Sequence, residues 1–153
     1  MSSPQLTFRI DDPRAADVHP LIEQLDGYLT ERYSAPSPFP VSLDELSRSN
    51  VTFVTARVEE TPVACGACVN MGDYVEIKRM YVLPACRGLG LGKQLLEALE
   101  AQVRANGGSL VRLETGTAQT EALELYEHAG YRRCAPFGDH RSDTASICME
   151  KQL

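Results

Sequence analysis

The feature that most constrains this sequence is the segment Val82-Leu83-Pro84-Ala85-Cys86-Arg87-Gly88-Leu89-Gly90-Leu91-Gly92. A strand-like stretch precedes it and leucines at helical spacing follow it, so it connects the end of a strand to the start of a helix. Glycines let the backbone approach a ligand closely, and the unpaired amides at a helix N-terminus attract an anion. The segment therefore predicts a binding site for a pyrophosphate, to which Arg87 adds a charged donor.

The spacing of the glycines excludes two other nucleotide-binding motifs. Gly88, Gly90 and Gly92 do not form Gly-x-Gly-x-x-Gly, and the segment does not end in Gly-Lys-Ser/Thr. Neither a dinucleotide-binding fingerprint nor a Walker loop is therefore expected. A Gly-x-Gly-x-Gly run alone also occurs in simple tight turns, so the nature of the ligand depends on the rest of the chain.

Hydrophobic patterning over the 153 residues predicts one α/β (α+β) domain, 1–153, and no linker divides it. Strands are expected at 6–10, 51–58, 62–71, 74–83, 110–114, 131–135 and 145–150, and helices at 18–29, 43–48, 90–105 and 118–129. Asp17 is expected to cap the first of these helices. The three strands in the middle of the chain are separated by short turns, so they should pair as an antiparallel meander.

A second motif, Ala122-Leu123-Glu124-Leu125-Tyr126-Glu127-His128-Ala129-Gly130-Tyr131, follows one strand after the glycine-rich segment. With both motifs in this order, the chain resembles the GNAT superfamily of acetyl-CoA-dependent N-acetyltransferases. In that superfamily a strand ends in Val-x-Pro, Arg-Gly-x-Gly-x-Gly starts a helix, and Ala-x-x-Leu-Tyr-x-x-x-Gly-Phe/Tyr follows. The resemblance is close over about residues 74–133 and extends to the other segments in their order and type.

The resemblance implies a GNAT fold, with a central mixed, mostly antiparallel sheet of about six to seven strands, splayed at strands 4 and 5 and flanked by about four helices. In this superfamily the pantetheine arm of acetyl-CoA lies in the gap between the splayed strands. Carried over to this chain, the backbone of Met80, Tyr81 and Val82 would bind the thioester and the pantetheine. The pyrophosphate would accept hydrogen bonds from the amides of Arg87, Gly88, Leu89, Gly90, Leu91, Gly92 and Lys93. Gln119 stands where many relatives have an asparagine, and the resemblance assigns it a further contact with the cofactor.

Transfer to an amine requires a group that removes a proton, because an alkylamine of pKa ~10.4 is neutral only about once in 2,500 molecules at pH 7. Glu76 is the candidate base. It stands six residues before Val82, so strand alternation would place it on the same face as Met80 and Val82. It also resembles the glutamate base of some family members. Glu114 and a water molecule are the alternatives, and either carboxylate could instead be a charge on the sheet surface.

Tyr126 resembles the family's general acid, which protonates the departing thiolate of CoA, and the same position contacts the cofactor. A phenol of pKa ~10 is a suitable proton donor to a thiolate. As a plain helix-face aromatic, the same residue would belong to the core. The expected acceptor contacts are Phe39 in a proline-dense loop, Glu114, and His140 in the last connection between strands.

Composition narrows the function further. The formal net charge of −6 argues against nucleic acid as a partner, because phosphate-backbone binding usually requires a basic face. The first residues do not form a signal sequence, no run approaches the roughly 18 apolar residues of a membrane span, and the five cysteines cannot all pair. A cytoplasmic protein with no membrane partner is therefore expected. Cys65 and Cys68 lie in a predicted strand, where such positions face opposite sides, so no metal site is expected.

Taken together, the sequence predicts an enzyme, a GNAT-type N-acetyltransferase that moves an acetyl group from acetyl-CoA to a primary amine. The amine would belong to a small molecule, a peptide or a protein and would attack the thioester directly in a ternary complex. The alternative is a non-catalytic module that binds acyl-CoA as a sensor or regulator. Homodimers are common among relatives, and the C-terminal strands could pair across such an interface. The acceptor, the length of the acyl chain and the oligomeric state stay open at this point.

Overall fold

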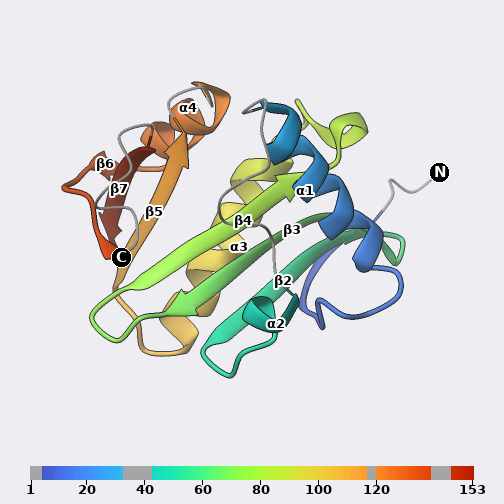
Figure 1. Ribbon diagram of the computed structural model, residues 1–153, viewed down its shortest axis with the longest axis horizontal. Coiled ribbons are helices and arrows are strands. Elements are labelled where there is room, and N and C mark those ends of the chain that lie inside the picture. The colour runs from blue at the N-terminus through green and yellow to red at the C-terminus, as the bar shows by residue number, and fades with distance from the viewer. Residues whose placement is uncertain (1–4, 33–42, 117–119, 139–145) are drawn as a thin grey trace.

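The computed structural model describes residues 5–32, 43–116, 120–138 and 146–153, with residues 29–32 described as backbone only. Within these residues, seven strands form one sheet in the order β1-β2-β3-β4-β5-β7-β6 (Figure 1). The strands are β1 Leu6–Ile10, β2 Val51–Val58, β3 Thr61–Asn70, β4 Val75–Val82, β5 Leu110–Gly116, β6 Arg132–Arg133 and β7 Ser146–Gln152. The helices are α1 His19–Arg32, α2 Leu43–Leu46, α3 Leu91–Ala105, α4 Thr120–His128 and the 3-10 helix η1 Pro84–Cys86.

All neighbouring strands in the sheet are antiparallel except β4 and β5, which run parallel. The predicted mixed, mostly antiparallel sheet with about four helices is confirmed for the described residues. The strand expected at 131–135 is shorter than predicted, because the register with β7 holds only Arg132–Arg133, after which the Cys134 amide makes one more hydrogen bond to the Cys148 carbonyl. No helix in the described residues is long and apolar enough to cross a membrane.

Helices cover both faces of the sheet. α3 and α4 pack on one face, where Leu95, Leu96 and Leu99 are at most 1% exposed. Burial of each such side chain contributes roughly 1.5–3 kcal/mol, so this face holds the main core. α1 and α2 pack on the other face, and Figure 1 shows them in front of the sheet with α3 behind it. We call these two sides the α3 face and the α1 face.

A bulge in β4 determines which side chains point to each face. Arg79 has a φ of 59°, and the register between β3 and β4 shifts beside Gly66. A Cβ at Gly66 would lie 2.7 Å from Leu99 Cδ1 and 3.2 Å from Met80 Cγ, so a larger residue there would force these side chains to move. The thiol of Cys65 donates a hydrogen bond to the Arg79 carbonyl at 3.6 Å, which gives this carbonyl a partner at the bulge.

The bulge overturns the expected placement of Glu76. Ile77 before the bulge and Met80 and Val82 after it all pack against the core of the α3 face. Glu76 is next to Ile77 in the strand, so its side chain points to the α1 face, opposite to the side chains of Met80 and Val82. Simple alternation from Glu76 to Val82 is wrong because the extra residue at the bulge reverses the order of the faces.

β4 and β5 separate soon after they pair. The last pair in their register is Ile77↔Leu113, whereas β4 continues to Val82 and β5 continues to Gly116. The bulge at Arg79 follows closely after this pair and bends β4 away from its neighbour. Figure 1 shows the two strands diverging toward their C-terminal ends. The predicted splay at strands 4 and 5 is therefore confirmed.

A buried arginine ties β2 to the segment before α1. The Arg57 side chain is 3% exposed and donates hydrogen bonds to the carboxylates of Asp11 and Asp17 and to the carbonyl of Glu60. The cap expected at Asp17 is wrong. α1 begins at His19, and the Asp17 carboxylate accepts a hydrogen bond from Arg57 Nη1 at 2.6 Å instead. A buried guanidinium loses more free energy without a partner than an exposed helix end does.

We expect acid to lower the folding stability of the Asp11→Asn variant less than that of the wild type. Burial alone would raise the pKa of Asp11, but hydrogen bonds from Arg57 and Thr55 outweigh it and hold this pKa below its usual range. A carboxylate with a lowered pKa stabilises the fold above its unfolded pKa of about 3.9, and this contribution is lost as pH falls through the folded pKa. The Tm of the variant should therefore fall less steeply as pH drops below about 4.

At neutral pH the same variant should be destabilised by roughly 1–3 kcal/mol, because the Arg57 guanidinium keeps fewer charged partners. Asp73→Asn in the exposed turn before β4 is the matched control and should behave like the wild type. If the Tm of Asp11→Asn fell with decreasing pH as steeply as that of the control, this role of the ion pair would be contradicted.

Candidate active site

The loop between β4 and α3 presents unpaired amides. Gly88 and Gly90 have φ values of 81° and 78°, in the left-handed region that glycine adopts without strain. The Gln94 amide donates to the Gly90 carbonyl at 3.2 Å, so the amides of residues 91–93 precede this first hydrogen bond of the helix. A Cβ at Gly88 or Gly90 would meet no described atom within 4 Å, so the space above the loop is open. This geometry suits an anionic group such as a pyrophosphate.

The side chain of Arg87 turns back from the loop toward the protein. Its Nε donates to the Val82 carbonyl at 2.9 Å, and its guanidinium carbon lies 5.4 Å from the centre of the Tyr28 ring and 5.3 Å from that of Tyr81. Tyr28 belongs to α1, so Arg87 connects this helix to the loop. The guanidinium expected to add a charged donor therefore lies over two adjacent aromatic rings, and the backbone amides are the donors that remain at the predicted anion site.

Tyr126 and Met80 meet where β4 and β5 separate. The hydroxyl of Tyr126 donates to Met80 Sδ at 3.9 Å, although the two residues are 46 positions apart. α4, which carries Tyr126, lies against the start of α3, because a Cβ at Gly92 would be 3.4 Å from Leu125 Cδ2. The fold thus places the tyrosine of the second motif beside the strand residue expected to hold the thioester. Sulfur is a weak acceptor, so the hydroxyl retains capacity for a stronger partner.

Burial keeps the Tyr126 hydroxyl protonated. Burial first, and then the negative charge of Glu114, raise the pKa of Tyr126 to about 12. Its ring packs edge-on against Tyr131, with 5.9 Å between the ring centroids. The Tyr131 hydroxyl in turn donates to Glu100 Oε2 at 2.7 Å, and Lys151 Nζ lies 3.2 Å from the same carboxylate. The phenol is therefore neutral at pH 7 and carries the proton that a general acid donates, and burial makes it a weaker acid than a free phenol.

Two carboxylates lie on the α1 face beside the gap. Glu76 is 6% exposed, and Glu114 follows Leu113, the last β5 residue that pairs with β4. Leu113 packs into the core of the α3 face, so Glu114 points to the α1 face. Ser146 Oγ donates to Glu114 Oε1 at 2.6 Å. Both candidate bases therefore approach the gap from the α1 face, whereas Tyr126 approaches it from the α3 face.

The other predicted site residues are placed as follows. Phe39, Gln119 and His140 lie outside the described residues. Leu91 is buried in the core of the α3 face, whereas Leu89 and Lys93 are exposed at the loop and the first turn of α3. The Tyr81 side chain packs on the α1 face, and its backbone pairs with Cys65 of β3 rather than facing the gap beside β5.

Sequence patterning misses Tyr28 and Arg112. Both become neighbours of site residues only through tertiary contacts, Tyr28 beside the Arg87 guanidinium and Arg112 as the β5 partner of Glu76. No local pattern marks such contacts. The bulge in β4, in contrast, has a signal in the sequence, because an isolated glycine within a strand, such as Gly66, is typical of a bulge.

Cys65 and Cys68 point to opposite faces of the sheet, as strand alternation predicts. Cys65 lies in the core of the α1 face and Cys68 in that of the α3 face. Burial raises the pKa of each thiol to about 12. Among the described residues, no group of three or more His, Cys, Asp or Glu side chains could hold a metal ion. The two thiols are therefore buried side chains of the core.

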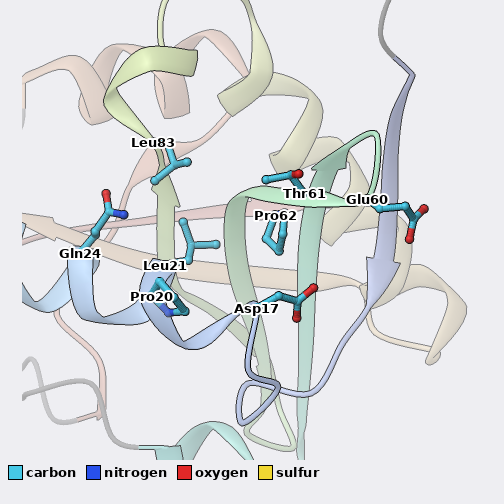
Figure 2. Close-up of a pocket in the computed structure, with 8 residues that line it drawn as sticks. All are labelled: Asp17, Pro20, Leu21, Gln24, Glu60, Thr61, Pro62 and Leu83. Atoms are coloured by element: carbon cyan, nitrogen blue, oxygen red, sulfur yellow. The ribbon is translucent and has the colours of Figure 1, made fainter.

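A pocket of about 280 Å³ lies near the C-terminal end of β4, beside α1 and the turn between β2 and β3 (Figure 2). It is lined by Asp17, Pro20, Leu21, Gln24, Glu60, Thr61, Pro62 and Leu83. Its two carboxylates already have cationic partners, since Asp17 accepts a hydrogen bond from Arg57 and Glu60 accepts one from Arg9. The groups suited to chemistry lie instead where β4 and β5 separate.

Comparison with known sequences is consistent with this arrangement. A model of the acetyltransferase (GNAT) family matches residues 18–131, which include the glycine loop, both splayed strands and Tyr126. The chain is 40% identical over 152 residues to a protein of Azospirillum brasilense named IAA acetyltransferase, covering 98% of this chain and 99% of that protein. It is 28% identical over 149 residues to the uncharacterized N-acetyltransferase YsnE of Bacillus subtilis, covering 95% and 99% of the two chains.

Solved structures show the same architecture. A Klebsiella pneumoniae protein, whose name is that of an acyl-CoA N-acyltransferase, has a TM-score of 0.80 and 33% identity, with 97% of each chain covered. The PaiA N-acetyltransferase of Thermoplasma acidophilum, solved with coenzyme A, has a TM-score of 0.74 at 17% identity, with 97% and 99% covered. At this lower identity the likeness shows the fold alone.

Proposed function

The chain belongs to the GNAT acetyltransferase family and is an acyltransferase, and from this premise we propose that it transfers an acetyl group from acetyl-CoA to a primary amine of a small molecule, peptide or protein. The observation that carries the proposal is the contact between the Tyr126 hydroxyl and Met80 where β4 and β5 separate. A proton donor beside an anion-binding loop is what cleavage of a thioester with a phosphorylated leaving group requires.

The donor occupies the loop and the gap between the strands. The amides of residues 88–93 hold its pyrophosphate, which the open space above Gly88 and Gly90 supports, whereas the Arg87 amide already donates to the Pro84 carbonyl at 3.3 Å. β4 has no described pair with β5 after Ile77, so most of its backbone on that side is open to another partner, although the Val82 carbonyl already accepts a hydrogen bond from Arg87 Nε. The amide groups of a pantetheine arm can supply such hydrogen bonds in the way an added strand does.

The amine attacks the donor directly in one ternary complex. Its neutral nitrogen attacks the carbonyl carbon of the thioester, so that a C–N bond forms and the C–S bond breaks. The amine proton passes to the Glu76 carboxylate, directly or through water, and the departing thiolate takes a proton from the Tyr126 hydroxyl. Glu76 and Tyr126 approach the gap from opposite faces, which keeps the two proton transfers apart. Glu114 is the alternative base.

The Glu76→Gln variant should lower kcat about tenfold at pH 7, with the affinity for acetyl-CoA unchanged. The loss should shrink as pH rises toward the amine's own pKa of ~10.4, because a growing fraction of the amine has then lost its extra proton to solvent before it binds. Rates of thiol release across pH check this, with Glu114→Gln measured in parallel. If this pH dependence of kcat appeared in Glu114→Gln but not in Glu76→Gln, Glu114 would be the base. If both variants kept the wild-type pH dependence, water would be the base.

Initial-rate kinetics and mass spectrometry test the proposed function. Direct attack predicts intersecting double-reciprocal lines and an acceptor that gains one acetyl group. The protein incubated with acetyl-CoA alone should stay unmodified. The acceptor panel contains primary amines and IAA, the compound in the name of the Azospirillum brasilense relative. Parallel lines together with an acetylated protein would contradict the ternary complex, and acetyl-CoA binding without any acetylated acceptor would favour a sensor.

A further inference from the structure

Arg112 is held in a fixed position on the α1 face. Its guanidinium carbon lies 4.8 Å from the centre of the Tyr74 ring and 5.7 Å from that of Phe137. The two rings contact each other edge-on with 5.3 Å between their centroids. The Arg112 Nε donates to Glu150 Oε2 at 3.0 Å. These contacts restrain the long side chain before a ligand binds, so it has little conformational entropy left to lose on binding.

These contacts use only part of the guanidinium. Nε is bonded to Glu150, whereas the two terminal nitrogens donate no hydrogen bond to any residue that the structure describes. The Arg112 side chain is 30% exposed. A guanidinium that is fixed through its Nε and its ring contacts, with its terminal nitrogens unused, is suited to binding a carboxylate through two parallel hydrogen bonds.

Arg112 lies next to the proposed base. It is the β5 partner of Glu76 in the parallel register, and neighbouring strands are about 4.8 Å apart. The next pair, Ile77 and Leu113, packs into the core of the α3 face, so Arg112 and Glu76 both point to the α1 face. A negative and a positive side chain thus stand side by side on the face from which the amine approaches.

We propose that Arg112 binds a carboxylate of the acceptor, so that the acceptor is a small molecule with both a primary amine and a carboxylate, as in an amino acid. This inference rests on the proposed acetyltransferase function. The ammonium of such a molecule would lie toward Glu76 and its carboxylate toward Arg112, which gives charge complementarity at both ends. Glu150 orients the guanidinium through Nε and leaves the terminal nitrogens for the substrate.

The test compares acceptors that differ only in the carboxylate. Glycine, β-alanine and longer ω-amino acids are each paired with their carboxamides, and thiol release gives kcat/KM for every member. The wild type should favour the carboxylate of at least one pair by on the order of tenfold to a hundredfold. Arg112→Gln should bring this ratio close to one, mainly through KM, with acetyl-CoA affinity unchanged in calorimetry. Arg112→Lys should keep part of the preference, because it keeps the charge but not the fork of donors.

The matched control is Arg104→Gln on the exposed part of α3, which should keep the wild-type ratio. Equal rates within every pair in the wild type, or a preference that survives Arg112→Gln, would overturn the inference and leave the acetyltransferase proposal standing. If Arg112→Gln does not fold, the ratios of the wild type and Arg112→Lys decide between the same two outcomes. No thiol release with any amine, despite acetyl-CoA binding, would overturn the proposed function and this inference together.

Discussion

Gly90→Glu should lower the affinity for acetyl-CoA by at least about a hundredfold while the protein stays folded. Gly90 caps α3, and the new carboxylate would stand where the pyrophosphate is proposed to bind, so like charges would repel. A Cβ at this position meets no described atom within 4 Å, so the substitution causes no clash within the protein. Its φ of 78° costs a larger residue roughly 1–2 kcal/mol, less than the stability of a typical domain. Calorimetry with acetyl-CoA and circular dichroism check the two halves of this expectation.

Gly107→Glu is the matched control for that experiment. Gly107 has a φ of 83°, a Cβ there also meets no described atom within 4 Å, and it lies just past the opposite end of the same helix. The strain and the added charge are therefore equal, but the proposed phosphate site is about 20 Å away along α3. Wild-type affinity for acetyl-CoA in both variants would show that the loop does not bind the pyrophosphate. An equal loss of affinity in both variants would show a general electrostatic effect.

Tyr126→Phe should lower kcat by on the order of tenfold to a hundredfold with the affinity for acetyl-CoA nearly unchanged. The pKa of Tyr126, raised to about 12 mainly by burial, keeps its proton available at neutral pH for the departing thiolate. Phenylalanine fills the same space between Met80 and Tyr131, so packing is retained and only the proton donor is lost. Single-turnover thiol release separates the chemical step from product release.

Tyr131→Phe provides the contrast, because it removes a buried hydroxyl from the same aromatic pair. This hydroxyl donates to Glu100 rather than to the gap, so its loss should cost roughly 1 kcal/mol of stability and leave kcat unchanged. Tyr126→Phe should show the opposite pattern, with kcat reduced and the free energy of unfolding nearly retained. A wild-type kcat in Tyr126→Phe would reassign that residue to packing alone.

Features with a local signal could be predicted from the sequence. The leucines of α3 recur at helical spacing and are buried as expected, and Gly90 occupies the left-handed position at which the helix starts. The order of strands and the splay beside β4 do not follow from periodicity. The splay was accessible through the resemblance carried by two motifs, and the register that ends at Ile77↔Leu113 confirms it.

Features that depend on tertiary contacts could not be predicted. The bulge at Arg79 moves Glu76 to the face opposite Met80, because one extra residue in the strand reverses the alternation. The Arg87 guanidinium turns inward because Tyr28 of α1 and a ring of β4 lie beneath it, and neither neighbour is visible from local spacing. Arg112 acquires its place beside Glu76 only from the parallel register.

Isothermal titration calorimetry of acetyl-CoA into the purified protein, followed in the same sample by thiol release on addition of an amine panel, tests the central claim most directly. The account predicts micromolar binding, and CoA release that depends on the amine and is reduced in Tyr126→Phe. No detectable binding of acetyl-CoA to the folded protein would contradict it.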